Sequence, residues 1–324
     1  MCTAAAYHTN DFYFGRTMDL DRSFGEEIIV TPRNYPLLFR QARGLNTHYA
    51  IIGAAVVQDG YPLYYDGLNE KGLSMAGLNF VGNAVYHDAL PDKDNIAQFE
   101  FMPWILGQCA SIKDARYLLS RINLTPLPFR ENFFVAQLHW IIADRNEVIV
   151  VEPMASGIKV YDDPADVLTN NPPFPQQLFQ LNNYMGLSPQ PPVNNFSDRL
   201  DLQAYSHGIG AIGLPGDLSS QSRFARAAFH LLNSHSGNSE RESISQLFHV
   251  LNAVSMPRGS CILESGQYYF TVYTSCCNAN KGIYYYTTYD NPQISAVQLF
   301  HCDLSQATLI RFPMLQTLQV RWQN

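Results

Sequence analysis

A cysteine follows the initiator methionine directly, as Cys2 in Met-Cys-Thr-Ala-Ala-Ala-Tyr. A small second residue is what permits removal of Met1, and removal would leave a cysteine with a free α-amine. One residue then carries both a thiol nucleophile and an amine that can act as its base. The alternative is a cysteine that stands near the chain start by accident, so the interpretation depends on the residues around it.

Arg16 and Asp19 provide charges that could activate such a nucleophile. They lie in Phe-Gly-Arg-Thr-Met-Asp, where the second strand of a hairpin would return them to the chain start. A guanidinium beside the sulfur favours the thiolate, and a carboxylate beside the α-amine orients it by hydrogen bonding. An α-amine, with an ordinary pKa of about 8, suits a base near neutral pH. Spacing alone leaves open a surface ion pair on a hairpin.

Two asparagines stand at the ends of predicted strands. Asn79 ends the apolar run Gly-Leu-Ser-Met-Ala-Gly-Leu-Asn, and Asn170 follows Val-Leu-Thr and precedes Asn-Pro. Cleavage of an amide passes through an oxyanion, which needs fixed N–H donors from side chains or backbone. Ordinary turn chemistry is the competing interpretation, because Asn-Pro by itself favours a turn.

Two further patterns are weaker. Gly208, Gly210 and Gly213 match the dinucleotide-binding pattern G-x-G-x-x-G, but no strand precedes them and Leu-Pro-Gly-Asp interrupts any following helix. We expect these glycines to shape a loop that delivers Arg223.

None of the nine histidines has a local motif that would pair it with a thiol, and His139 is interpreted as a core or pocket residue.

The composition is that of a globular protein without nucleic-acid or membrane features. The chain is 46% hydrophobic and 15% charged, and its net charge is −7. Its lysines and arginines form no basic stripe of the kind that binds nucleic acid. No apolar run approaches the roughly 18 residues that span a bilayer, and no signal-peptide pattern is visible, so a cytoplasmic location is expected. The six cysteines include no C-x-x-C pair, and we expect reduced thiols, with Cys276 and Cys277 in the core and no metal or cofactor.

Strand-rich and helix-rich segments alternate along the chain. Helices are expected over residues 98–108, from Ser111 to about residue 122, and over 220–232 and 240–254. Residues 172–192 are expected to be an extended loop. Each helical pair can cover one sheet, which predicts one α+β domain over residues 1–324 with two sheets face to face. Strands are expected at 3–7, 12–16, 27–31, 48–57, 63–66, 73–78, 139–143, 147–151, 158–161, 167–169, 268–273, 282–289 and 294–300.

Together these segments resemble the choloylglycine hydrolase family of N-terminal nucleophile hydrolases, which contains bile salt hydrolases and penicillin V acylases. The resemblance spans nearly the whole chain in the expected order, and it implies a four-layer αββα sandwich that cleaves an amide. The matching segments are Met-Cys-Thr, Phe-Gly-Arg-Thr-Met-Asp, Asp-Gly-Leu-Asn-Glu-Lys-Gly-Leu, Ala-Gly-Leu-Asn-Phe, Leu-Thr-Asn-Asn-Pro, Gly-Leu-Pro-Gly-Asp, Ser-Arg-Phe and Tyr-Thr-Ser-Cys.

The resemblance implies catalytic roles near the chain start. Cys2 matches the nucleophile and its α-amine the base, Arg16 matches the arginine beside the sulfur, and Asp19 matches the carboxylate that holds the amine. The base role requires removal of Met1, because the nitrogen of Cys2 is otherwise an amide nitrogen. Family members of this branch need only that removal and no propeptide.

The resemblance also implies an oxyanion hole. Asn170 matches its side-chain donor, Asn79 its backbone N–H donor, and Arg223 the arginine that supports the cluster. Bile salt hydrolases place Asn where penicillin V acylases typically place Tyr, so Asn79 favours the bile salt branch.

The implied substrate is a glycine- or taurine-conjugated bile acid. Met18 matches a residue that lines the sterol pocket, and Phe129 and Phe133 lie in the loop that borders it. Aromatic walls suit a large apolar steroid, although ordinary core packing also explains both phenylalanines. A Pro-Gln-Pro-Pro stretch at 188–193 matches a protruding loop that forms homotetramers in related enzymes. The alternatives are a penicillin V acylase or other N-acyl amidase or acyltransferase, and a protein that binds amphiphiles without catalysis.

Overall fold

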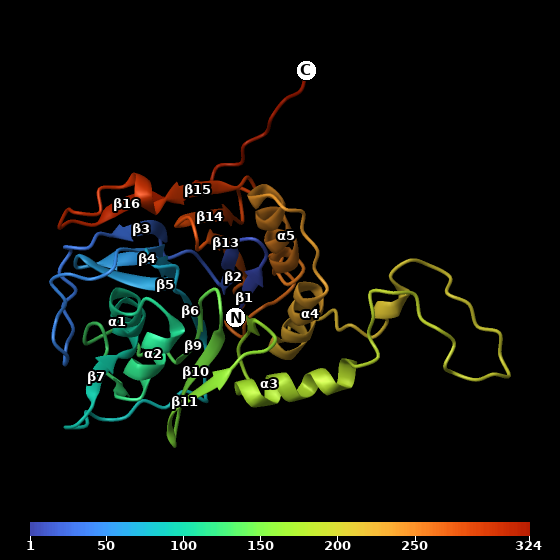
Figure 1. Cartoon of the computed structure of the whole chain (residues 1–324), viewed down its shortest axis with the longest axis horizontal. Helices are drawn as coiled ribbons and strands as arrows, with labels where there is room; N and C mark the ends of the chain where they lie inside the picture. Colours follow the sequence, from blue (N-terminus) through green and yellow to red (C-terminus); the bar gives the residue numbers. More distant parts are fainter.

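Two antiparallel sheets form the centre of the fold in a computed structural model that describes residues 1–324 (Figure 1). The six-stranded sheet has the order β12-β1-β2-β13-β14-β15, and the eight-stranded sheet has the order β11-β10-β9-β6-β5-β4-β3-β16. The strands of the first sheet are β1 (Cys2–His8), β2 (Phe12–Leu20), β12 (Val167–Leu168), β13 (Phe270–Asn278), β14 (Ile283–Thr288) and β15 (Ser295–Gln298). Those of the second are β3 (Glu27–Thr31), β4 (Ile51–Gln58), β5 (Tyr61–Asn69), β6 (Ser74–Asn79), β9 (Leu138–Ala143), β10 (Val148–Met154), β11 (Gly157–Asp162) and β16 (Ile310–Pro313).

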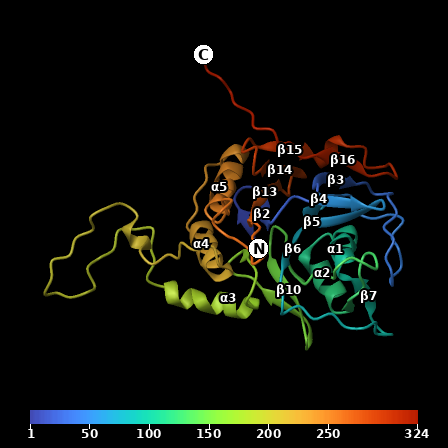
Figure 2. The same cartoon turned by 180° about the vertical axis from the view of Figure 1, so that it is seen from behind.

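Helices cover the outer face of each sheet. Helices α4 (Ser220–Leu232) and α5 (Glu240–Asn252) pack on β1, β2 and β13, while α1 (Phe101–Gln108) packs on β4, β5 and β6 and against α2 (Ile112–Leu119). The layers are visible in Figure 1 and, from behind, in Figure 2. The predicted αββα sandwich is therefore confirmed. None of the helices combines the length and apolarity needed to cross a bilayer.

Alternating strand residues supply two separate apolar cores. In β3, Ile28 and Val30 belong to the inner core, which fills the space between the sheets and continues under α4 and α5, whereas Ile29 belongs to the outer core under α1 and α2. In β9, Ile141 faces the inner core and Ile142 the outer one. Successive side chains of a strand point to opposite faces, so strands that are buried on both faces must be apolar nearly throughout.

Three features of the fold differ from the sequence-based expectation. The segment predicted as an extended loop contains α3 (Phe174–Gln180), which begins after Pro173 as its N-cap residue and carries Pro175 in its first turn, where proline is tolerated. The second predicted helix ends at Leu119, and Ile122 instead begins β8 (Ile122–Thr125). That strand pairs in parallel with the unpredicted β7 (Asp94–Ala97), and the short unpredicted β16 pairs with β3.

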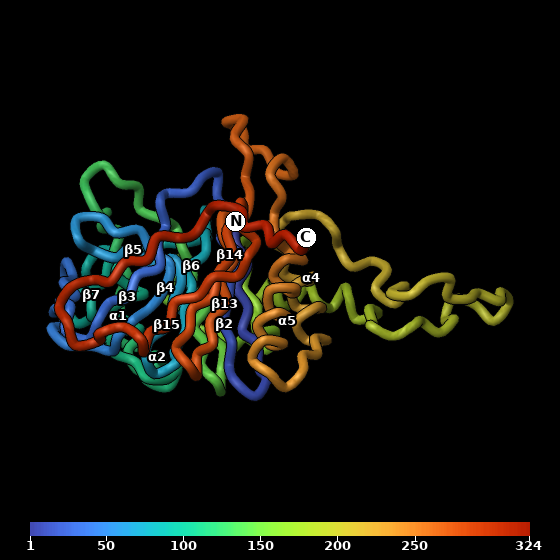
Figure 3. Tube along the Cα trace, turned by 90° about the horizontal axis from the view of Figure 1, so that it is seen from above, coloured from blue at the N-terminus to red at the C-terminus, as the bar shows by residue number.

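A long arm leaves the body after α3, as Figures 1 and 3 show in yellow. Its apolar side chains Met185, Val193, Phe196 and Tyr205 are 79–82% exposed. Gly210 closes the base of the arm, because its carbonyl accepts from Ser188 N–H and a Cβ there would lie 2.1 Å from the carbonyl oxygen of Gln190. The G-x-G-x-x-G glycines thus shape a loop, as expected.

Candidate active site

The β1–β2 hairpin returns the predicted residues to the chain start. Cys2 lies opposite Met18 and Ala4 lies opposite Arg16, and directly opposed side chains share one face of a sheet. That face is turned toward the eight-stranded sheet, because the Arg16 guanidinium reaches the backbone of β5 and β6. Cys2 is 2% exposed and belongs to the inner core.

Arg16 is fully buried, which excludes the surface ion pair that the spacing left open. Its Nη1 donates to Tyr65 O at 2.9 Å and Gly77 O at 2.8 Å, while Nη2 has no hydrogen-bond partner. Burial acts to lower the pKa of Arg16, but attraction to Cys2, the largest of the opposing interactions, helps to raise it above its ordinary value. The site thus contains a permanent cation beside the sulfur.

Asp66 is a buried counter-charge that the sequence-based interpretation missed. Its Oδ2 lies 3.9 Å from Arg16 Nε, and its oxygens accept hydrogen bonds from Tyr273 and Tyr284, each at 2.6 Å. Burial raises the pKa of Asp66, against the attraction of Arg16 and these donors. The only local signal is an acidic residue within an otherwise apolar strand.

Asp19 is held rigidly on the opposite face of β2. Its Oδ1 accepts from Thr271 Oγ1 at 2.7 Å and its Oδ2 from Thr17 Oγ1 at 3.4 Å. The Asp19 backbone pairs with Met1 in both directions, each bond being 3.1 Å long. With Met1 attached, no hydrogen bond joins the Asp19 carboxylate to the nitrogen of Cys2.

Asn170 and Arg223 form hydrogen bonds with the backbone of Cys2. The N–H of Cys2 donates to Asn170 Oδ1 at 2.8 Å, and Arg223 Nη2 donates to the same oxygen at 2.7 Å. Arg223 Nη1 donates to Cys2 O at 2.5 Å. Helix α4 presents this fully buried arginine one turn after its Ser219 N-cap. The structure therefore brings Cys2, Asn170 and Arg223 into one network.

The backbone of Asn79 faces the same network. Phe80 N–H donates to Gln137 O, so Phe80 and Gln137 form a hydrogen-bonded pair where β6 ends and β9 begins. Hydrogen-bonded and non-hydrogen-bonded pairs alternate along an antiparallel ladder. The neighbouring pair, Asn79 and Leu138, is therefore not hydrogen-bonded. The N–H and C=O of Asn79 thus point away from β9, and the C=O accepts from Asn170 Nδ2 at 2.8 Å. A primary amide has two N–H donors, so Nδ2 retains a second one.

The amino terminus itself is partly buried. The Met1 amine donates to Asp19 O at 3.1 Å and to the hydroxyl of Tyr269, a residue that the sequence-based interpretation also missed. Burial lowers the pKa of this amine, and burial raises the pKa of the Tyr269 hydroxyl. An amine in these surroundings is shifted toward its neutral, basic form.

The other cysteines differ from Cys2 in their surroundings. All six are free, and Cys276 and Cys277 are buried in β13, as predicted. Burial raises the pKa of the Cys109 thiol to about 12 and raises those of Cys276 and Cys277 as well. These core thiols therefore stay neutral near pH 7, and none of these residues accepts a guanidinium hydrogen bond on its backbone oxygen as Cys2 does from Arg223.

The predicted pocket residues occupy two places. Met18 is 5% exposed beside Cys2, whereas Phe129 is 7% exposed in an aromatic cluster with Tyr61, Phe99 and Phe133. Phe133, at 38% exposure, forms the open side of that cluster. The role of these rings in substrate binding stays a prediction.

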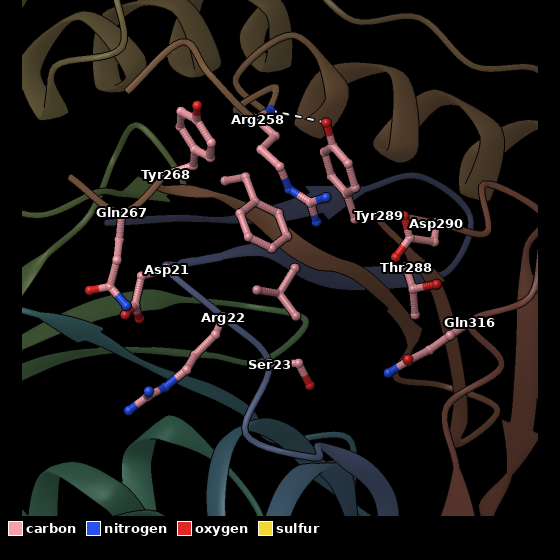
Figure 4. Close-up of a pocket in the computed structure, with 12 residues that line it drawn as sticks. Asp21, Arg22, Ser23, Arg258, Gln267, Tyr268, Thr288, Tyr289, Asp290 and Gln316 are labelled. Atoms are coloured by element: carbon pink, nitrogen blue, oxygen red, sulfur yellow. Dashed lines mark hydrogen bonds between the residues drawn. The ribbon is translucent and has the colours of Figure 1, made fainter. Parts of the chain in front are cut away.

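A separate pocket of about 460 Å³ opens beyond the end of β2 (Figure 4). Phe270 and Val272 are among its lining residues, and the Arg258 guanidinium stacks over the rings of Phe270 and Tyr289, 4.3 and 4.8 Å from their centroids. None of the predicted site residues lines it, although Asp21 on its rim follows closely after Asp19.

The chain belongs to the choloylglycine hydrolase family of linear amide C–N hydrolases, whose family model matches residues 2–312. It is 49% identical to a bile salt hydrolase/transferase of Lactiplantibacillus plantarum over 98% of each chain. It is 37% identical to a bile salt hydrolase/transferase of Clostridium perfringens over the whole of both chains.

Solved structures agree with this assignment. The C2A mutant of the conjugated bile acid hydrolase from Clostridium perfringens has a TM-score of 0.92 at 36% identity, with both chains fully covered. A penicillin V acylase from Agrobacterium tumefaciens has a TM-score of 0.75 at 20% identity over 96% of this chain and 91% of its own, and shows the shared fold alone.

Proposed function

We propose that this protein is a bile salt hydrolase that cleaves the amide bond of glycine- or taurine-conjugated bile acids through a thioester on Cys2. The observation that carries the proposal is the network in which Asn170 Oδ1 accepts from both Cys2 N–H and Arg223. This network of the Cys2 backbone, the Asn170 amide and the buried Arg223 supports the proposal, as does the similarity of the chain to named bile salt hydrolases. Met18 beside Cys2, with Phe129 and Phe133, would form the apolar walls for the steroid.

The proposed reaction begins after removal of Met1, when the α-amine of Cys2 accepts the thiol proton. The thiolate attacks the substrate carbonyl carbon, a C–S bond forms, and the π electron pair moves to oxygen. Asn170 Nδ2–H and Asn79 N–H hold this oxyanion. The C–N bond then breaks, and the amine leaves with the proton from the Cys2 ammonium.

Water completes the cycle. The neutral α-amine takes a proton from water, which attacks the thioester carbonyl through a second oxyanion in the same hole. The C–S bond breaks, and the bile acid leaves while the thiolate takes up the proton again. Asp19 orients the amine, and the Arg16 guanidinium stabilises the thiolate.

Replacing Asn170 by alanine removes the proposed side-chain oxyanion donor. We expect kcat to fall on the order of 10²–10³-fold, measured as glycine release from glycocholate by purified, processed enzyme. A variant within a few-fold of wild type would contradict the oxyanion role. Asn171→Ala is the matched control, because the Asn171 side chain donates instead to Val81 O on the exposed side of the turn.

The substrate itself is tested by comparing kcat/KM for glycocholate, taurocholate and penicillin V. The proposal expects clear preference for the bile acid conjugates. Preference for penicillin V would instead favour the acylase alternative, and transfer of the acyl group to an added amine would identify an acyltransferase. Tight binding of bile acids with retained Met1 and no product would favour an amphiphile-binding protein.

We further propose a homotetramer in the cytoplasm. The exposed apolar side chains of the arm, residues 185–208, support the assembly, because so many apolar groups on one projecting segment favour burial against another copy. The six free cysteines fit a reducing compartment. Light scattering after size exclusion measures the mass in solution, and a monomeric wild type would contradict the assembly.

A further inference from the structure

A fully buried histidine–glutamate pair lies behind both halves of the proposed oxyanion hole. His139 on β9 and Glu152 on β10 are each 0% exposed, and His139 Nδ1 lies 3.1 Å from Glu152 Oε1. We propose that this pair is a positioning device that aligns Asn79 and Asn170 with each other. The inference rests on the proposed function, since it concerns the same reaction.

His139 contacts the residue next to each asparagine. Its Nε2 lies 2.9 Å from Thr169 O, one residue before Asn170. Its ring stacks on Phe80, one residue after Asn79, with centroids 4.3 Å apart and planes inclined by 6°. One imidazole therefore fixes the ends of β12 and β6, two segments that are far apart in the sequence.

Glu152 holds the other side of the Asn170 turn. Its Oε1 accepts from the N–H of Phe174, the first residue of α3, at 2.9 Å. The pair thus forms hydrogen bonds with Thr169 before the turn and with Phe174 after it. Gln177 of α3 adds a further bond, donating from Nε2 to Asn170 O.

Hydrogen-bond chemistry fixes the orientation of the imidazole. A carbonyl oxygen only accepts, so His139 Nε2 carries a proton toward Thr169 O. Both ring nitrogens are engaged, so His139 is not available as a base for Cys2. Glu152 Oε2 is buried without a hydrogen-bond partner, a costly arrangement that simple core packing would not require. A positioning role accounts for a polar pair at this place.

The test uses His139→Leu in processed enzyme. Displacement of the two donors should lower kcat about 10–100-fold, because misplacement by about 1 Å has effects of that size. KM and the rate of Cys2 alkylation by iodoacetamide should stay within about 2-fold, since alkylation forms no oxyanion. His48→Leu is the matched control, because buried His48 also bonds two backbone carbonyl oxygens, at 2.7 and 2.8 Å, away from the site. Its kcat per folded enzyme should equal that of wild type.

Combining variants separates positioning from general damage. If His139 acts by aligning Asn170 with Asn79, then His139→Leu should lower kcat clearly less in an Asn170→Ala background than in wild type. Additive losses, or alkylation slowed as much as kcat, would overturn the positioning role. If His139→Leu does not fold, His139→Gln provides the test, because its amide can still donate to Thr169 O and should restore most of kcat. Near-normal kcat in Asn170→Ala would instead remove the proposed oxyanion hole itself.

Discussion

Serine in place of Cys2 is expected to lower kcat for glycocholate by at least about 10³-fold while the protein remains folded. A hydroxyl is a much weaker nucleophile than a thiolate near neutral pH, so formation of the covalent intermediate should be slowed by orders of magnitude. The replacement is nearly isosteric, so the inner core that contains Cys2 should tolerate it. Initial rates of glycine release and the thermal midpoint would be measured on the same preparation.

Cys261→Ser is the matched control for this substitution. Cys261 is only partly buried and lies outside the Cys2 network, so its replacement should leave kcat unchanged. Wild-type turnover by Cys2→Ser would show that another group is the nucleophile. In that case His139 and the buried thiols of β13 would be poor replacements, because the first has both nitrogens bonded and the second are neutral.

A blocked amino terminus should have an effect of similar size without changing any side chain of the site. A leader that ends in a factor Xa site immediately before Cys2 turns its nitrogen into an amide, which cannot accept the thiol proton. We expect activity at least about 10³-fold below that of the released enzyme, because general base catalysis and nucleophile activation are lost together. Factor Xa treatment should then restore activity in step with the appearance of the Cys2 amino terminus by mass spectrometry.

The two forms of this leader protein serve as each other's control. The folded state should be the same before and after cleavage, because the chain with Met1 attached already pairs with the Asp19 backbone on β2. Full activity before cleavage would show that the α-amine is not the base, even if Cys2 remains the nucleophile. The substitution and the leader therefore test the two functions of the same residue separately.

Local sequence signals predicted the elements that lie close together in the chain. The β1–β2 hairpin is one example, since its short turn forces Cys2 next to Met18 and Arg16 near Ala4. The apolar strands and four of the helices were predictable from periodicity and caps for the same reason. The candidate site residues could be named because their types and order resemble one family, and their catalytic roles stay predictions.

Contacts between distant segments were not predictable from local patterns. Strand β2 pairs with β13, which follows about 250 residues later, and this pairing delivers Thr271 to Asp19 and Tyr273 to the neighbourhood of Arg16. Asp66 and Glu152 each look like an isolated acid in a strand until the sheets are assembled. His139 was interpreted as a core or pocket residue, and only the fold reveals that it touches the neighbours of both asparagines.

The division of the interior into two cores has a practical consequence for engineering this enzyme. Cys2 and Met18 belong to the inner core, whereas the side chains beneath α1 and α2, such as Ile105 and Ile142, belong to the outer one. The eight-stranded sheet separates the two, so repacking the outer compartment can raise heat resistance while leaving turnover untouched. Directed evolution for durability should therefore accumulate its changes on that side of the molecule.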